Sequence, residues 1–333
     1  MFSEEILYKS GDGGYHAFRI PVLATTPKKA LLAFCEARAG KADDYGKIDI
    51  LIKRREKGGE WSEPIKLVGD GKRTYHNPCT INDGDKIHLF YGIEYLQIFH
   101  AVSYDDGKTF VEHEEITSVF PDVPFTAVAV GPGTGVNACG KLLTPVWIAM
   151  GGANGHPHAC SFVGVLYSEN AKDWAYKSIK MPGVIYPNES QIATLSDGSL
   201  VMTVRHCSTR HNRVKIYSND GINWSEPIWE ENIPDQACMA SILNVGDKIL
   251  FSNPAYSETF NGWADRKEIT VRISQDDTKT WEYARMVTDK WSGYSHLANV
   301  DDEYYLLYET NLGEQSKMDL VIATFDEKWV KGE

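Results

Sequence analysis

Long hydrophobic segments are missing from this 333-residue sequence. Its apolar runs are short, as in Pro145-Val146-Trp147-Ile148-Ala149-Met150, whereas a helix that crosses a bilayer needs roughly 20 apolar residues. The opening MFSEEILYKS has no basic start followed by an apolar stretch, which a secretory signal requires. We therefore expect a cytoplasmic protein with no membrane partner, or a secreted protein if the start has been trimmed.

Positive charge is also in deficit. The chain has 34 Lys and Arg against 46 Asp and Glu, which gives a formal net charge of −12 and a sequence pI of about 5.3. An acidic protein is a poor partner for the phosphates of nucleic acid, so no nucleic-acid partner is expected. Hydrophobic residues make up 42% of the chain, which is enough for a folded core and excludes wholesale disorder. No obligate protein partner is visible in the sequence.

Paired cysteines are absent. None of the six cysteines belongs to a Cys-x-x-Cys pair, so neither a zinc site nor a disulfide framework is expected. His156-Pro157-His158 and His206-Cys207 contain metal-binding side chains but lack the spaced partners that such a site needs. The sequence therefore predicts no metal and no organic cofactor, and it favours reduced cysteines that pack as small hydrophobic residues.

Helical periodicity is scarce, and a short apolar strand recurs in its place. Copies of this strand start at residues 31, 87, 142, 200, 249 and 305, so that neighbouring copies lie 49 to 58 residues apart. Repeats of this length, each with about four short strands, are typical of a β-propeller. No linker or composition shift divides the chain. We therefore predict one all-β domain over residues 1–333, a six-bladed β-propeller whose last, degenerate turn lies near Trp329.

A polar turn, which we call the clasp, keeps the same spacing. The pattern S-x-D-x-G-x-T-[WF] is met at residues 103–110, with Thr in place of Gly at 274–281, and shorter copies occur at 168–174 and 218–224. A degenerate copy ends at Trp61. In such a turn the Asp side chain accepts backbone N–H bonds, Gly allows a positive φ, and the aromatic residue packs on the sheet. We interpret the clasps as structural hairpin turns rather than as calcium or ligand sites.

The strand order predicts which polar residues meet. We take the recurring strand as the second of each blade and place the clasp after the third. Because successive strands run antiparallel, one end of the propeller then holds the start of each first strand, the end of each second strand and the start of each third strand. Any one of the polar residues there could be an ordinary surface or core residue. Together they point to a binding site at the mouth of the central channel. They are Arg19, Arg38, Asp43, Asp44, Glu189, Arg205, Arg266 and Tyr294.

The segment Phe18-Arg19-Ile20-Pro21, combined with the clasps, resembles the sialidase (neuraminidase) family of six-bladed propellers, and the resemblance extends to Tyr308-Glu309. It implies an arginine triad, a tyrosine nucleophile with a glutamate partner, and an aspartic acid. Two aspartates compete for the last role, and the pattern Asp44-Tyr45-Gly46 favours Asp44 as acid/base, with Asp43 solvated at the substrate site. By position the other roles fall on Arg19, Arg205 and Arg266 (triad), Tyr294 (nucleophile), Glu189 (its partner) and Arg38 (a further site arginine).

The resemblance implies an exo-α-sialidase that acts on sialylated oligosaccharides or glycoconjugates. Sialic acid carries a carboxylate on its anomeric carbon, and three guanidinium groups can hold that carboxylate through charge-assisted hydrogen bonds. A carboxylate nucleophile would be repelled by the same charge, whereas a neutral tyrosine would not. Sialidases with a tyrosine nucleophile are a known exception among glycosidases that use paired carboxylates. The implied reaction retains the anomeric configuration through a covalent glycosyl-tyrosine intermediate.

Three alternatives stay open. A hydrolase of a related keto-sugar acid, such as the deaminated analogue, would use the same arginines and differ in the pocket for the C5 substituent, for which Trp147 and residues 151–157 are candidates. A non-catalytic carbohydrate-binding propeller predicts losses among Tyr294, Glu189 and the aspartate pair, and none is lost. Sialyl transfer would need the same residues and an acceptor site.

Overall fold

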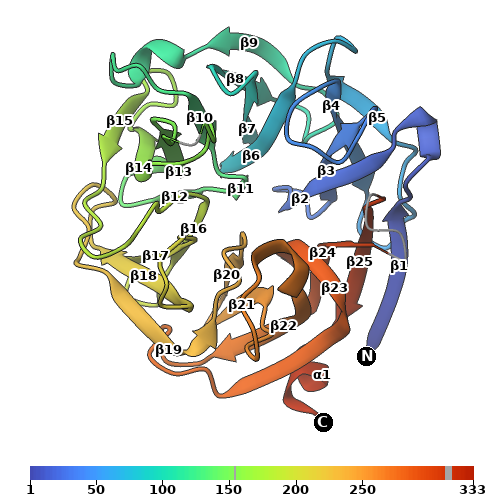
Figure 1. The fold of residues 1–333 in the computed structure, drawn as a ribbon. Helices are drawn as coiled ribbons and strands as arrows, with labels where there is room; N and C mark the ends of the chain where they lie inside the picture. The colour runs from blue at the N-terminus through green and yellow to red at the C-terminus, as the bar shows by residue number, and fades with distance from the viewer. Residues whose placement is uncertain (154, 312–316) are drawn as a thin grey trace.

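The structure, a computed structural model, describes residues 1–153, 155–311 and 317–333. Its β-sheets stand around a central axis in a propeller arrangement, with the strands β2, β6, β16 and β20 facing the centre (Figure 1). No helix in these ranges is long and apolar enough to cross a membrane. The all-β prediction is confirmed, apart from three short 3-10 segments and one five-residue helix.

The first four sheets follow one another along the chain, except that β11 of the second sheet comes after β10 of the third. The first has the order β2 (Ala17–Thr25), β3 (Leu31–Arg38), β4 (Ile48–Arg55) and β5 (Ile65–Val68). The second consists of β11 (Gly133–Thr134), β6 (Tyr75–Asp83), β7 (Lys86–Ile93), β8 (Gln97–Ser103) and β9 (Val111–Glu115). The third consists of β10 (Ala127–Val130), β13 (Lys141–Ala149), β14 (Ser161–Ser168) and β15 (Ala175–Ser178), with β12 (Val136–Ala138) paired to β13. The fourth consists of β16 (Ser190–Thr194), β17 (Leu200–Val204), β18 (Asn212–Ser218) and β19 (Ile228–Pro234).

The prediction of six blades is wrong, because the strands of the described residues form five sheets. One seven-stranded sheet replaces two of the expected blades. Its strand β23 is 18 residues long and pairs with β22 through its first half and with β24 through its second half, so no break separates the two groups. The sheet has the order β1 (Phe2–Tyr8), β25 (Asp319–Phe325), β24 (Glu303–Thr310), β23 (Tyr283–Val300), β22 (Lys267–Ser274), β21 (Lys248–Pro254) and β20 (Ser241–Val245).

The two ends of the chain meet in this last sheet. Strand β1 pairs antiparallel with β25, with Phe2 opposite Phe325, so the N-terminal residues supply the outermost strand after the C-terminal ones. The repeat pattern predicted a last, degenerate turn near Trp329. In the structure Trp329 lies instead in the helix α1 (Glu327–Lys331), where its ring stacks on that of Phe2 with 4.4 Å between the ring centres. The repeat could not predict the pairing of β1 with β25, because β1 lies outside the period of the other strands.

The recurring apolar strand is confirmed. In each group of strands it is the second, counted outward from the central axis, and the six copies are β3, β7, β13, β17, β21 and β24. In β3 all eight residues are buried, because sheets pack against both of its faces. Continuous apolar runs rather than alternating ones are the expected pattern for such a strand. The propeller core is therefore divided into layers between neighbouring sheets.

The clasps hold neighbouring sheets together. Asp105 accepts hydrogen bonds from the backbone N–H groups of Lys108 (3.1 Å) and Thr109 (2.8 Å), as the pattern predicts. Gly107 has a φ of 80°, and a Cβ built on it would lie 2.5 Å from the side chain of Leu32 in the preceding sheet, so only glycine fits without displacing that side chain. Thr278, which replaces this glycine in a later clasp, keeps a positive φ of 67°. The clasps lie between the third and fourth strands, away from the end described next.

Candidate active site

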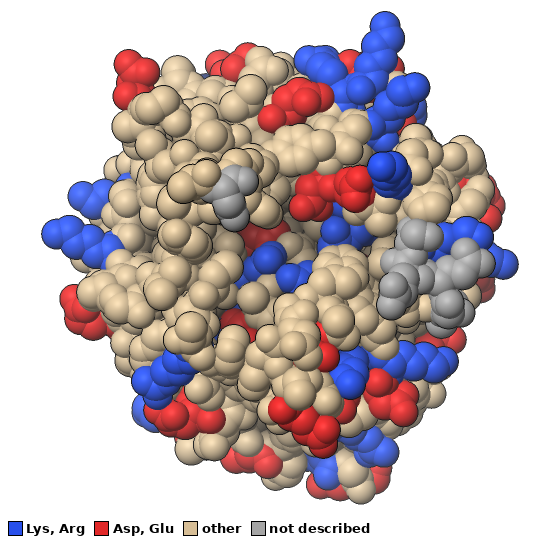
Figure 2. Space-filling view, viewed as in Figure 1, with Lys and Arg blue, Asp and Glu red and all other residues tan. Residues whose placement is uncertain are grey.

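A pocket of about 350 Å³ opens at the end of the propeller where the inner strands start. The space-filling view shows a hollow at the centre of this face, with basic and acidic side chains at its floor (Figure 2). Although the protein is acidic, three arginines line the pocket with one aspartate and one glutamate. The lining residues from the predicted set are Arg19, Asp44, Glu189, Arg205, Arg266 and Tyr294.

A backbone bulge places the first of these arginines. In β2 the pairing with β3 shifts by one residue between Arg19 and Val22, and Ile20 has a φ of 55°. Such a bulge re-aims a side chain at the end of a strand without disturbing the rest of the sheet. The neighbouring strand β6 has the same irregularity after His76, with a φ of 49° at Asn77. Asn77 consequently lines the same pocket.

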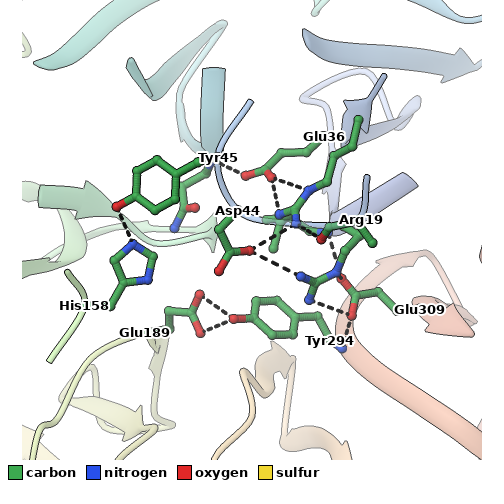
Figure 3. A network of polar contacts seen from close by, with 12 residues as sticks. Arg19, Glu36, Asp44, Tyr45, His158, Glu189, Tyr294 and Glu309 are labelled. Carbon is green, nitrogen blue, oxygen red and sulfur yellow. Dashed lines mark hydrogen bonds and ion pairs between the residues drawn. The ribbon is translucent and has the colours of Figure 1, made fainter. Parts of the chain in front are cut away.

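Tyr294 and Glu189 meet at the floor of the pocket (Figure 3). The phenol oxygen of Tyr294 donates to the carboxylate of Glu189, at 2.7 Å from Oε1 and 2.6 Å from Oε2. Arg205 donates to the same phenol oxygen at 2.6 Å and forms an ion pair with Glu189. Burial raises the pKa of Tyr294 well above its usual value; Arg205 opposes this shift and Glu189 adds to it. The phenol is therefore neutral and has a carboxylate base in direct contact.

Arg19 is held by a glutamate that the sequence did not single out. Its Nε and Nη2 donate to the two carboxylate oxygens of Glu309, at 3.1 and 3.3 Å, and Glu309 also accepts from the backbone N–H groups of Ile20 and Tyr294. Burial would lower the pKa of Arg19, but the carboxylates of Glu309 and Asp44 outweigh burial and raise it. Glu309, whose side chain is fully buried, thus fixes a predicted clamp arginine to the backbone of the predicted nucleophile.

Asp44 lies between two arginines (Figure 3). Its Oδ1 is 3.0 Å from Nη1 of Arg38 and 3.3 Å from Nη1 of Arg19, and its side chain is 44% exposed. Partial burial favours protonation, but the two guanidinium groups outweigh it and hold the pKa of Asp44 well below its usual range. The neighbouring Asp43 is exposed and borders only an adjoining hollow, so it does not line the same pocket.

Arg38 does not line the pocket in which the other arginines meet. It is almost fully buried, and its Nε and Nη2 donate to Glu36 Oε2 at 3.2 and 2.6 Å. Burial raises the pKa of Glu36, while the charge of Arg38 counteracts that shift. The structure therefore places Arg38 beside Asp44 rather than at the pocket surface.

Arg266 is held differently from the other two pocket arginines. Its Nη2 donates to the backbone oxygen of Ala237 at 2.6 Å, and its guanidinium lies over the ring of Trp263, with 5.1 Å to the centroid. The ring of Tyr294 lies at 5.8 Å. Among the described residues, no carboxylate forms an ion pair with Arg266.

The remaining wall of the pocket is aromatic and carries unsatisfied donors. Tyr95, Trp147 and His158 pack together there, and His158 contacts the phenol of Tyr45 at 3.1 Å. Within the described residues, Asn77 Nδ2 and Trp147 Nε1 are buried and have no hydrogen-bond partner. Trp147 was among the predicted candidates for the C5 substituent, and residues 151–153 and 155–157 belong to the loop that precedes His158.

No group of three or more His, Cys, Asp and Glu side chains in the described part of the chain could hold a metal ion. Sequence reasoning missed Glu309, Glu36, Trp263 and Asn77. A signal existed for Asn77, because Tyr75-His76-Asn77-Pro78 has the same aromatic and proline spacing as Phe18-Arg19-Ile20-Pro21. The others carry no local pattern, since their roles depend on partners far away in the sequence.

Residues 29–306 match the family of BNR repeat-like domains. The exo-alpha-sialidase of Arthroderma benhamiae is 26% identical, over 95% of this chain and 85% of that protein. The exo-alpha-sialidase of Aspergillus fumigatus is 27% identical, over 85% and 74%. The sialidase of Bacteroides fragilis is 26% identical, over 92% of this chain and 62% of that protein.

Solved structures share the fold. A Hadza microbial sialidase superimposes with a TM-score of 0.83 at 22% identity, covering 98% of this chain and 69% of that one. The intramolecular trans-sialidase of Ruminococcus gnavus gives a TM-score of 0.82 at 17% identity, and the alignment covers 98% of both chains.

Proposed function

Because this chain belongs to the sialidase family and is a glycoside hydrolase, we propose that it releases terminal α-linked sialic acid from oligosaccharides or glycoconjugates, with retention of configuration. The observation that carries the proposal is the contact between the Tyr294 phenol and the Glu189 carboxylate in a pocket lined by three arginines. A neutral nucleophile beside a cluster of cations suits a substrate whose reacting carbon carries a carboxylate.

The arginines form the carboxylate clamp. Arg19, Arg205 and Arg266 present guanidinium groups to one pocket, and guanidinium N–H groups bind a carboxylate in planar, charge-assisted geometry. Partly buried cations act more strongly than exposed ones, because little water screens them. This local field attracts a sugar acid in spite of the net charge of −12.

Tyr294 is the proposed nucleophile and Glu189 its base. In the first step, the phenol oxygen bonds to the anomeric carbon while the bond from that carbon to the leaving oxygen breaks, and Glu189 takes the phenol proton. A phenol with a raised pKa needs a base in contact, and Glu189 meets this need at 2.6 to 2.7 Å. In the second step, water bonds to the same carbon, the tyrosine oxygen leaves, and Glu189 returns the proton.

Asp44 is the proposed acid/base. It gives a proton to the leaving oxygen in the first step and takes one from the attacking water in the second. Arg19 and Arg38 lower the pKa of Asp44 in the free enzyme. A substrate carboxylate that engages Arg19 would draw this guanidinium away from Asp44, which raises the pKa of Asp44 toward the range an acid needs.

Two measurements test the proposal. A fluorescent aglycone linked to α-N-acetylneuraminic acid should be released, and 2,3-difluorosialic acid should add its glycosyl mass to the intact protein, with the added mass mapping to Tyr294. A Trypanosoma rangeli sialidase of the same fold has been solved with 2,3-difluorosialic acid as a covalent intermediate. Absence of both release and adduct would overturn the proposal, whereas release without an adduct at Tyr294 would overturn only the mechanism.

The deaminated sugar acid is the second candidate substrate. The unpaired N–H groups of Asn77 and Trp147 call for acceptor oxygens, which either a C5 acylamino carbonyl or a C5 hydroxyl supplies. The same aglycone on both sugars separates the two, because only the C5 substituent then differs. The larger kcat/KM identifies the preferred substrate.

A further inference from the structure

Trp263 lies at the rim of the pocket, on the 3-10 segment η3 (Gly262–Asp265), and its side chain lies beside two of the clamp arginines. The guanidinium carbons of Arg19 and Arg266 are 4.7 and 5.1 Å from the centre of its ring. Trp291 holds Trp263 in place. The indole N–H of Trp291 donates to the backbone oxygen of Trp263 at 2.9 Å, and the centres of the two rings lie 4.8 Å apart. Trp263 is nevertheless 40% exposed.

The clamp arginines differ in how their charges are compensated. Arg19 forms ion pairs with Glu309 and Asp44, and Arg205 forms one with Glu189. Arg266 is 6% exposed and has the carbonyl of Ala237, while its buried Nε has no partner among the described residues. The face of an indole attracts a cation and leaves the N–H groups at the edge of the guanidinium free. A carboxylate in the same place would occupy the donors that a ligand must use.

We propose that Trp263 is a positioning residue of the carboxylate clamp, whose ring holds the guanidinium groups of Arg19 and Arg266 through its face. The inference rests on the proposed function, because it takes a sugar carboxylate as the ligand of these arginines. Arg19 keeps Glu309 if the ring is lost, so the effect falls mainly on Arg266. The carboxylate of the ligand should therefore bind more weakly without the ring.

The test uses a ligand that has the carboxylate but no aglycone and no turnover: the 2,3-didehydro analogue of N-acetylneuraminic acid, with its C1 methyl ester as the uncharged reference. Calorimetry gives Kd for wild type, Trp263→Phe and Trp263→Leu. Trp263→Leu should weaken the acid by about threefold to thirtyfold, the range of a cation–π contact, whereas Trp263→Phe should recover most of the loss. The ester should bind the variants and wild type equally.

A matched control is Trp229→Leu, which removes a ring that lies 4.9 Å from Arg210 outside the pocket. It should leave both ligands unaffected. In turnover assays Trp263→Leu should raise KM by a similar factor with kcat nearly unchanged, because the contact exists before and during the reaction.

Three results would overturn the inference. Trp263→Leu could bind the acid as tightly as wild type does. It could weaken acid and ester equally, which would show an apolar contact with the sugar. It could leave the didehydro acid unaffected and raise KM only for substrates with large aglycones, which would make Trp263 an aglycone contact. Failure of wild type to bind the acid at all would instead remove the proposed function, and the inference with it.

Discussion

The phenol oxygen of Tyr294 lies 2.6 and 2.7 Å from the two carboxylate oxygens of Glu189, although 105 residues separate them in the sequence. Each comes from an inner position of a different sheet: Glu189 directly precedes β16, and Tyr294 lies in the second half of β23. This contact places a carboxylate, which can accept a proton, directly against a buried phenol.

Tyr294→Phe tests the contact directly. The variant keeps the ring that the three arginines face and loses only the oxygen, so the fold should survive. We expect turnover of an aryl sialoside to fall by orders of magnitude. The control is Tyr217→Phe, which removes a phenol that contacts Thr278 at 2.8 Å away from the pocket. Near-wild-type turnover in Tyr294→Phe would exclude this tyrosine as the nucleophile.

Arg19→Lys tests the planar clamp. A lysine cannot reproduce the two hydrogen bonds to Glu309 and still present N–H groups to a ligand carboxylate. We expect kcat/KM to fall by at least about tenfold, a loss of about 1.4 kcal/mol in transition-state binding. Arg210→Lys, which changes an exposed arginine paired with Glu231, should leave kinetics unchanged. Equal kinetics for both variants would contradict the assignment of Arg19 to the clamp.

The choice between Asp44 and Asp43 is tested with two leaving groups. Asp44→Ala should cripple release of a sugar leaving group, by about 10² to 10⁴-fold, and spare an activated aryl leaving group that needs little protonation. Asp43 is exposed and outside the pocket, so Asp43→Ala should leave both rates nearly unchanged. The reverse pattern would assign the acid to Asp43.

The pH profile should respond to the buried pair beside Asp44. Asp44 must be protonated to act as an acid, so activity falls as pH rises through its pKa in the complex. The double variant Glu36→Gln/Arg38→Gln removes Arg38, the cation nearest to Asp44, together with Glu36, the buried carboxylate that pairs with it. The pKa of Asp44 should then rise, so the alkaline limb of the kcat profile should move to higher pH. Glu36→Gln alone frees Arg38 for Asp44 and should move the limb to lower pH. Two shifts of the same sign would show that Arg38 does not control Asp44.

Stability should decrease in mild acid because of a buried histidine pair. His88 Nδ1 and His100 Nε2 are 2.8 Å apart, and burial lowers the pKa of His100 to about 3 and also lowers that of His88. In the unfolded chain each histidine takes up a proton near pH 6.5, whereas in the folded protein His100 does so only near pH 3. The stability of the fold is therefore unaffected by this pair above pH 6.5 and decreases as the pH falls from there toward 3. We expect the free energy of unfolding to drop by up to about 1.4 kcal/mol per pH unit for each histidine.

Urea unfolding between pH 7 and pH 4 measures this slope. His100→Gln removes one titrating group and should flatten the pH dependence, whatever its effect at pH 7. An unchanged slope would mean that other groups, such as the buried His76 and His296, dominate acid unfolding.

The sequence by itself determined the recurring strand, the clasps and the end of the propeller at which the polar residues lie. These features are local: a buried strand needs an apolar run, and a turn such as residues 103–110 needs its Asp and Gly at fixed offsets. Because strand direction alternates, the position of a residue within its repeat then fixes the end on which it lies. This reasoning placed Arg19, Arg205, Arg266, Glu189 and Tyr294, all of which line one pocket.

Only the tertiary structure decided how many sheets form and which charges pair. The count of six failed because β23 continues without a break from one strand group into the next, and the hydrogen bonds of an unbroken strand are not visible in a repeat. The N-terminal strand joins β25 across nearly the whole chain. Glu309 reaches Arg19 over 290 residues, and Trp263 lies over Arg19 and Arg266 from a loop without any motif. Such partners are brought together by closure of the ring, so no local spacing could reveal them.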